Sequence, residues 1–148
     1  MQKNKGFTLI ELLVVIAIIG ILASVVLASL SSARQKGADA KIQAQLSNMR
    51  AQAELYYNSQ TPASYGTANT TAGSCTEAGT IFTDANGLLN LLEGVANPTC
   101  NSIGTAWAVS APLVSDATQF FCVDSIGTAE TGTKVANATT GLCEVPTP

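Results

Sequence analysis

Hydrophobic residues are concentrated in one uninterrupted run near the N-terminus. Within residues 7–30 the only charged side chain is Glu11, and 13 residues between positions 12 and 30 are Leu, Ile or Val. A helix over residues 7–30 would be roughly 36 Å long, which exceeds the roughly 30 Å hydrocarbon core of a bilayer. The aliphatic side chains favour insertion by about 4–8 kcal/mol, against about 3 kcal/mol for one carboxylate. The pattern therefore predicts a membrane-spanning helix.

The pattern becomes amphipathic after residue 30. No proline occurs before Pro62, so we expect the helix to continue to about Gln60. In this second part, apolar residues recur at steps of four and three, which places them on one helical face: Ile42, Leu46, Met49, Ala53 and Tyr56. We expect this face to pack against the rest of the chain.

A stretch rich in Ser, Thr and Gly follows the helix and reads as a loop. Residues 83–98 then predict a short helix. Thr83 or Asp84 would cap its start, and Gly94 and Pro98 would end it.

The C-terminal half has the alternating pattern of β-strands. Three segments predict strands, at residues 104–113, 118–125 and 141–145, and the glycine-rich residues 125–133 read as a joint between them. An antiparallel sheet with one apolar face would meet the apolar face of the helix. The expected fold class is α+β, with a long N-terminal helix packed on a small antiparallel sheet.

Charge and composition exclude several functions. Beyond Arg50 the only basic residue is Lys134, whereas acidic residues recur throughout. This balance argues against nucleic acid as a partner, because nucleic-acid binding needs clustered Lys and Arg. The chain has no histidine, so a Ser–His–Asp triad is impossible and the commonest metal ligand is missing. We expect a protein that is not an enzyme and that needs no cofactor.

No metal site is predicted either. The residues Asp84-Ala-Asn86-Gly87 resemble part of a calcium loop, but the late glutamate is missing, so we interpret them as a turn. Acidic residues of the C-terminal half have no ordered ligand spacing: Asp116, Asp124 and Glu130. Asn69 and Asn137 each begin an N-glycosylation triplet, and we interpret both as polar loop residues.

Four cysteines lie in the second half, none of them in a C-x-x-C pair: Cys75, Cys100, Cys122 and Cys143. An even number at wide spacing, downstream of a membrane segment, predicts two disulfides in an oxidising compartment. The alternative is four buried free thiols in a cytosolic domain. Three pairings are possible, and we favour Cys75–Cys100 and Cys122–Cys143, because nearest neighbours close modest loops.

The apolar N-terminus has three interpretations on pattern alone. A secretory signal peptide would be cleaved near Ser31-Ser32-Ala33, but its apolar region is usually only about 7–15 residues long. A plain membrane anchor explains the length but gives Glu11 no role. A buried core helix fails, because the chain lacks the surface to cover such a helix on every side.

A fourth interpretation rests on a family resemblance. Residues 5–22 read KGFTLIELLVVIAIIGIL, in which a glycine ends a short basic leader and a glutamate interrupts the apolar run. This stretch resembles the leader and N-terminal helix of type IV pilins and the related pseudopilins. The matching residues are Gly6, Phe7, Thr8, Leu9, Glu11 and Gly20. The globular half resembles that family in layout, with a long helix, a variable loop, an antiparallel sheet and a C-terminal disulfide.

The resemblance implies roles for individual residues. A membrane aspartyl peptidase would cut between Gly6 and Phe7 and then methylate the new amine of Phe7. Glu11 would pair with the terminal amine of a neighbouring subunit and set the register of assembly. Two alternatives rest on the residues: Glu11 lies one turn from its own Phe7 amine, and it lies near a helix N-terminus, where an anion is favoured. Many pilins have a proline where this chain has Ala28, so helix melting is less strongly implied.

The resemblance also implies a function. The chain would be a prepilin that polymerises through its N-terminal helix into a type IV pilus filament. Its expected segments are a cleaved leader (1–6), a transmembrane and polymerisation helix (7–30), an amphipathic helix (31–60) and a disulfide-bonded head (61–148). The alternatives are a pseudopilin of a type II secretion system and a membrane-anchored binding domain that does not polymerise.

The expected partners are neighbouring subunits in a homopolymer, a prepilin peptidase and methyltransferase, and the pilus or type II secretion assembly machinery. The expected location is the cytoplasmic membrane, as a single-pass precursor with its N-terminus inside, and then an extracellular or periplasmic filament. The leader lysines favour that orientation. Because Arg34, Lys36 and Lys41 follow the other end of the apolar run, the cysteines are the stronger argument.

Overall fold

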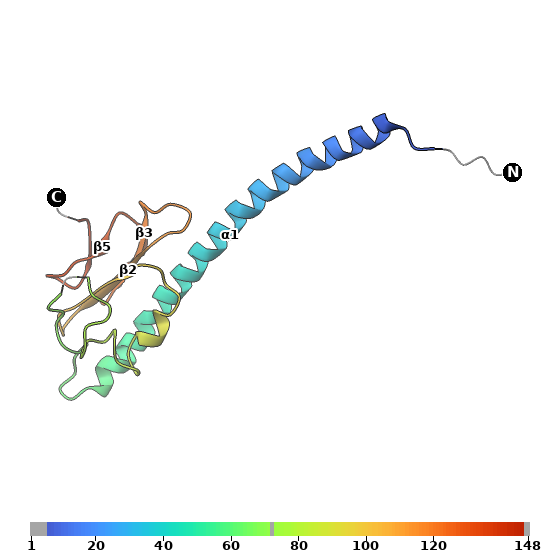
Figure 1. Cartoon of the computed structure of the whole chain (residues 1–148). Coiled ribbons are helices and arrows are strands. Elements are labelled where there is room, and N and C mark those ends of the chain that lie inside the picture. Colours follow the sequence, from blue (N-terminus) through green and yellow to red (C-terminus); the bar gives the residue numbers. More distant parts are fainter. Residues whose placement is uncertain (1–5, 72, 147–148) are drawn as a thin grey trace.

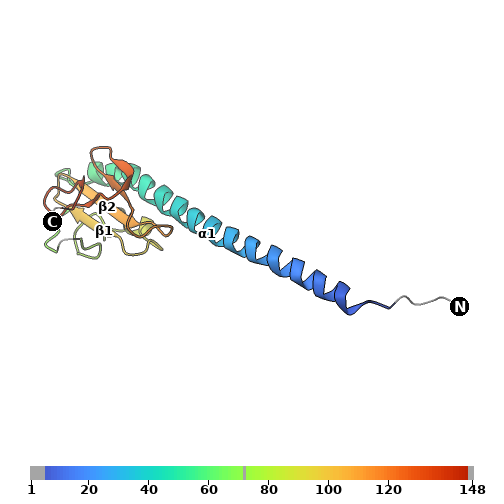
Figure 2. The same ribbon diagram turned by 90° about the horizontal axis from the view of Figure 1, so that it is seen from above.

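A single long helix dominates the fold. The computed structural model describes residues 6–71 and 73–146, so most of the expected leader lies outside the described residues. Helix α1 (Leu9–Ser59) is continuous over 51 residues. Its first half projects away from the head, and its second half lies along one side of the head (Figures 1 and 2). The predicted helix bounds are confirmed to within two residues.

The amphipathic stripe of α1 is confirmed as the contact with the head. All five predicted positions are buried, none with more than 5% of its surface exposed: Ile42, Leu46, Met49, Ala53 and Tyr56. They join one core cluster with Trp107, Val109 and Val123 of the sheet. Burying a large apolar side chain contributes about 1.5–3 kcal/mol, so this stripe is a major source of stability.

The head contains one four-stranded and one two-stranded antiparallel sheet. The larger sheet has the order β1-β2-β3-β4, and its strands are β1 (Thr99–Ser102), β2 (Trp107–Pro112), β3 (Phe120–Asp124) and β4 (Ala129–Gly132). The smaller sheet pairs β5 (Val135–Ala136) with β6 (Cys143–Glu144). The α+β class and the three predicted strands, which correspond to β2, β3 and β6, are confirmed.

The interpretation of residues 125–133 as a joint was wrong. These residues contain β4, which pairs with β3 and forms the edge of the larger sheet. Its residues Ala129, Glu130 and Thr131 are exposed, so no apolar alternation marks the strand. Strands β1 and β5 were not predicted either, because both are short and most of their side chains are polar or small.

The prediction of a short helix at residues 83–98 was also wrong. Only a 3-10 turn, η1 (Leu89–Leu91), forms there. The Asp84 carboxylate accepts a hydrogen bond from the Asn86 amide at 2.8 Å, and the Gly87 amide donates to the Asp84 carbonyl at 3.0 Å. A Cβ on Gly87 would lie 2.2 Å from the Ile81 carbonyl oxygen. The chain turns tightly at this point instead of continuing as a helix.

A buried carboxylate, Asp39, ties α1 to the head at the point where the helix leaves it. Asp39 is 7% exposed, and its Oδ1 atom accepts hydrogen bonds from the Val114 amide at 2.6 Å and the Ser115 amide at 3.3 Å. Burial raises the pKa of Asp39, but the hydrogen bonds from Ser115 and Val114 outweigh burial, so the pKa lies below its ordinary value. The loop between β2 and β3 is therefore held against the helix by a charged acceptor.

We predict that Asp39→Asn lowers the free energy of unfolding by about 1–2 kcal/mol at pH 7, because a charged acceptor is replaced by a neutral one. Since the folded-state pKa is lowered, the wild-type contribution is present above the ordinary aspartate pKa and is lost as the pH falls through the folded-state value. Thermal unfolding of the detergent-solubilised chain, followed by near-ultraviolet circular dichroism, measures the difference.

Asp116→Asn is the matched control, since Asp116 is exposed and bonds only within its own loop to Thr118. The difference between wild type and Asp39→Asn should shrink as the pH falls below the ordinary aspartate pKa. An equal loss at pH 7 and in strong acid, where the carboxyl group is protonated, would contradict a role for the ionised carboxylate.

Candidate processing and assembly site

The residues at the predicted cleavage site are open to solvent. Gly6 and Phe7 precede the helix, and Phe7 is 78% exposed. A Cβ added at Gly6 would meet no atom within 4 Å. The fold of this chain therefore does not require glycine at position 6, and any such requirement comes from a molecule that binds there.

Thr8 and Glu11 form a reciprocal cap at the start of α1. The Thr8 amide and hydroxyl donate to Oε2 of Glu11 at 2.8 and 2.7 Å, and the Glu11 amide donates to the Thr8 hydroxyl oxygen at 3.2 Å. This capping box satisfies backbone donors that the first turn of a helix leaves unpaired. The sequence Thr8-Leu-Ile-Glu11 carries the signature, although its role as a cap was not predicted.

The cap leaves part of the Glu11 carboxylate available. Both hydrogen bonds from Thr8 use Oε2, whereas Oε1 accepts none within the described residues. Glu11 is also exposed. A carboxylate has about four lone-pair sites, so an amine could bind Oε1 while the cap is kept. Within the described chain, before any cleavage, Thr8 is the partner of Glu11.

The apolar half of α1 has no cover in the isolated chain. Its large side chains between Leu9 and Leu30 are each at least 45% exposed. This helix is long and apolar enough to cross a membrane, and none of its most apolar window is buried. The helix passes Gly20 and Ala28 without interruption, and a Cβ at Gly20 would meet no atom within 4 Å.

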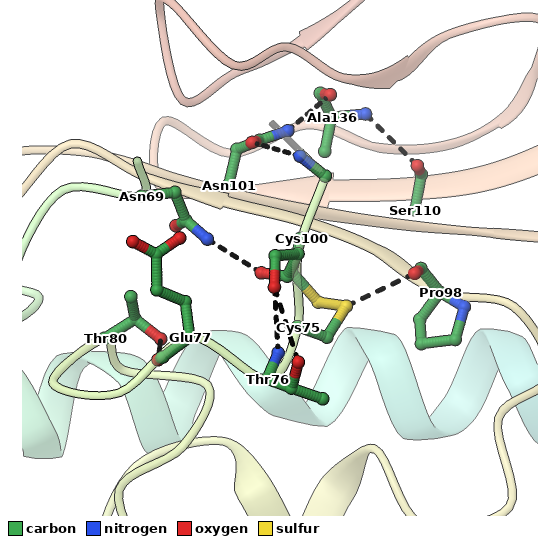
Figure 3. The surroundings of a disulfide bond; sticks show 12 residues. Asn69, Cys75, Thr76, Glu77, Thr80, Pro98, Cys100, Asn101, Ser110 and Ala136 are labelled. Carbon is green, nitrogen blue, oxygen red and sulfur yellow. Dashed lines mark hydrogen bonds between the residues drawn. A yellow bond between two sulfur atoms is a disulfide. The ribbon is translucent and has the colours of Figure 1, made fainter. Parts of the chain in front are cut away.

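The four cysteines form the two favoured disulfides. Cys75 is bonded to Cys100 and Cys122 to Cys143. Figure 3 shows the first bridge, which joins the loop after α1 to strand β1. Beside it, the buried Asn101 accepts a hydrogen bond from the Gly73 amide at 2.9 Å and donates to the Ala136 carbonyl at 2.7 Å. The bridge and Asn101 together hold the loop after α1, whose described residues 60–71 and 73–88 form no helix and only one isolated β-bridge, between Gly66 and Thr80.

The side chains of the two glycosylation-triplet asparagines are both engaged. The Asn69 amide group donates to the Ser74 carbonyl at 2.7 Å, and that of Asn137 donates to the Glu144 carboxylate at 2.9 Å. Each also accepts backbone hydrogen bonds through its oxygen. Both residues lie outside helices and strands, as expected of polar loop residues, and their side chains hold the loops together.

The three acidic residues considered for calcium lie in separate local networks. Asp124 is 1% exposed and accepts from three backbone amides, including that of Cys143 at 3.1 Å. Asp116 bonds to Thr118, and Glu130 forms a salt bridge with Lys134. Within residues 6–71 and 73–146, no group of three acidic or cysteine residues could hold a metal ion.

The chain is similar to proteins with a known N-terminal motif and a known assembly. A family model described as the prokaryotic N-terminal methylation motif matches residues 1–27. The chain is 37% identical over 116 residues to the type IV wide pilus major component PilA4 of Thermus thermophilus, which covers 76% of this chain and 85% of that protein. The chain therefore belongs to the type IV pilin family, and the resemblance seen in the sequence is confirmed.

A second relative comes from a secretion system. The chain is 38% identical over 56 residues to the type II secretion system core protein G of Klebsiella pneumoniae, which covers 38% of this chain and 40% of that protein. No solved structure matches the chain at comparable significance. The longer match with the pilus component includes much of the head as well as the helix.

We predict that Gly6→Ala leaves folding and membrane insertion unchanged but blocks removal of the leader. The added methyl group would meet no atom of the described residues within 4 Å, so a processing defect would report on the bound peptidase. Electrophoretic mobility of the membrane-bound protein, compared with wild type, measures leader removal. Ala28→Gly is the control, because it changes a single methyl group in α1, away from the cut. Normal processing of Gly6→Ala would remove Gly6 from the recognition site.

Proposed function

We propose that this chain is a structural subunit of a type IV pilus, made as a membrane-bound precursor and assembled through the apolar half of α1. The observation that carries the proposal is the contrast within one helix. Residues 9–30 have no cover, whereas the second half is packed against a complete, disulfide-bonded head. Such a helix is stable only in lipid or among other helices.

The assembly step exchanges one apolar environment for another. In the precursor, the bilayer surrounds residues 7–30; in the filament, the same residues of neighbouring copies surround one another. The head remains in water in both states, which fits its acidic and Thr-rich surface. The role is structural, and it is supported by the names of the relatives, a pilus component and a secretion-system core protein.

Glu11 would act as the register residue in this assembly. Cleavage after Gly6 creates a positively charged amine on Phe7, and methylation keeps that amine basic. The free Oε1 of Glu11 would accept the amine of a neighbouring subunit while Oε2 keeps its bonds to Thr8. A charge-assisted hydrogen bond in an apolar setting is strong and directional, so it would fix how far neighbours are displaced along their helices.

The proposed division of the chain follows from this mechanism. Residues 1–6 are the leader, residues 7–30 the membrane and filament helix, residues 31–60 the helix under the head, and residues 61–148 the head. The precursor would have its N-terminus in the cytoplasm, which puts both disulfides on the oxidising side. Its partners would be other copies, a prepilin peptidase and methyltransferase, and an assembly machine.

A second candidate is a pseudopilin of a type II secretion system, favoured by the match with the core protein G. A secretion defect after deletion of the gene, without loss of surface filaments, would support it. The third candidate is a membrane anchor that does not polymerise. The longer match with the pilus component favours the pilin, because it extends over most of both chains.

Mass spectrometry of the purified protein tests the proposal directly. We predict a mature chain that begins at Phe7, with one methyl group on its amine and with both disulfides intact. A chain that begins at Met1 would support the non-polymerising anchor. A chain that begins at Arg34 would identify a secreted protein and would overturn the proposed function.

We predict that Glu11→Val spares membrane insertion but abolishes filaments or reduces them severalfold, because the carboxylate that accepts the amine is lost. Thr8→Val is the matched control, since it removes the side-chain cap but keeps the carboxylate. Electron microscopy of sheared filaments, with immunoblots of the membrane fraction, separates assembly from insertion. Normal filaments from Glu11→Val would exclude Glu11 from the assembly contact.

A further inference from the structure

We propose that Glu93 on the head of one subunit forms an ion pair with Lys36 on the helix of a neighbouring subunit. This contact rests on the proposed function, since it requires a polymer. It is separate from the contact of Glu11 and involves the exposed rim of the head instead of the apolar core of the filament.

Glu93 differs from every other acidic residue of the chain in the bonding of its carboxylate. The other nine accept at least one hydrogen bond or form a salt bridge: Glu11, Asp39, Glu54, Glu77, Asp84, Asp116, Asp124, Glu130 and Glu144. The Glu93 carboxylate has no such partner within the described residues, and only its backbone carbonyl is used, by Gln45 at 3.1 Å. The side chain is exposed.

The surface around Glu93 fits the side chain of a lysine. Glu93 borders a pocket of about 430 Å³ whose other lining includes Cys75, Leu89, Leu92 and Pro98. A lysine has an apolar stem and a charged tip, so its stem can lie on apolar side chains while its ammonium group meets a carboxylate. The pocket contains one acidic side chain and no basic one.

The exposed cations that could meet Glu93 lie on α1: Arg34 and Lys36 precede Asp39, its first buried residue, and Lys41 follows it. Arg34, Lys36 and Lys41 are exposed, and the single salt bridge within the described residues, between Lys134 and Glu130, involves none of them. The head itself, in contrast, has seven acidic residues and one lysine. Opposite charges are therefore separated along the subunit, and a displaced neighbour could bring them together.

The symmetry of an open filament favours Lys36 over Lys41 and Arg34, and Arg34 shares the flank of Lys41 because it lies seven residues before it. A contact that propagates without closing must join two different surfaces of the subunit. Gln45 and Gln52, which bond to Glu93 and Asn86, mark the flank of α1 that faces the Glu93 side of the head. Lys41 lies on that same flank, with its Nζ atom near Gly94.

Lys36 lies on the opposite flank. It is seven and fourteen residues before Gln43 and Arg50, which puts the three on the same side of the helix. Gln43 bonds to Thr131 and Arg50 to Thr128, both in or beside β4. Lys36 precedes Asp39, the first buried residue of α1, so its own head does not cover it.

The contact also implies a direction of displacement. The backbone carbonyl of Glu93 accepts a hydrogen bond from Gln45, which lies nine residues beyond Lys36 on α1. The subunit that supplies Lys36 would therefore be shifted by about 13 Å toward the head end of the helix. When Glu11 pairs with the Phe7 amine of a neighbour, the subunit that supplies the amine is shifted by four residues, about 6 Å, toward the head end. The head of the subunit that supplies Glu93 would then cover the exposed helix segment of the neighbour that supplies Lys36.

Carbodiimide cross-linking of native sheared filaments tests this contact, because the reagent joins a carboxylate to an amine only where they touch. The expected result is covalent dimers that contain a Glu93–Lys36 peptide, identified by mass spectrometry, and that disappear in Glu93→Gln and Lys36→Gln. Lys41→Gln, on the other flank, should leave the dimers in place. Filaments without that peptide, or with Glu93 joined only to Lys41 inside monomers, would overturn the contact but not the proposed function.

Charge reversal gives a second and independent readout. Glu93→Lys and Lys36→Glu should each reduce filament yield about tenfold, because like charges would then face each other across the contact. The double variant should recover most of the yield, while membrane amounts and leader removal stay at wild-type levels. A defect in Lys36→Glu alone, with normal filaments from Glu93→Lys, would assign Lys36 to the membrane surface and overturn the contact.

Discussion

The packing of one face of α1 against the head is the interaction on which the rest of the structure depends. Because α1 is continuous from Leu9 to Ser59, the buried stripe that ends at Tyr56 fixes the head relative to the apolar half as well. The stripe is apolar throughout except for Asp39, which is placed where the head ends. A subunit of this design transmits the position of its membrane helix directly to its head.

The sequence was informative where a periodic pattern met a buried surface. The stripe of α1 was predicted residue by residue because each position is apolar and the step is helical. Strands β2 and β3 were predicted for the same reason, since Trp107, Val109 and Val123 alternate toward the core. The burial of Asp39 was not predicted, because it depends on backbone amides of a loop 75 residues away in the sequence.

Other parts of the structure had no local signal. Strand β4 is an exposed edge, so pairing with β3 and not burial makes it a strand. The leucines of residues 88–92 suggest a helix, but Leu88 is buried and its amide bonds to the Ile81 carbonyl at 2.8 Å, which the turn at Gly87 makes possible. At the candidate site, the residues were predicted from the family resemblance, whereas the free Oε1 of Glu11 depends on the rotamer that brings Oε2 to Thr8, which has no signal in the sequence.

The scarcity of charge gives each charged group a larger part in specificity. In assembly the apolar half of α1 exchanges lipid for other apolar helices, and apolar packing is non-directional, so it would tolerate many displacements between parallel helices. Register must come from groups that interact only at defined positions. Of the ten acidic residues, Glu11 has an unused oxygen in the apolar half and Glu93 has no carboxylate partner on the head, as far as the described part of the chain shows. The two proposed contacts imply different displacements, about 13 Å and about 6 Å, so they would join a subunit to two different neighbours and fix the register independently.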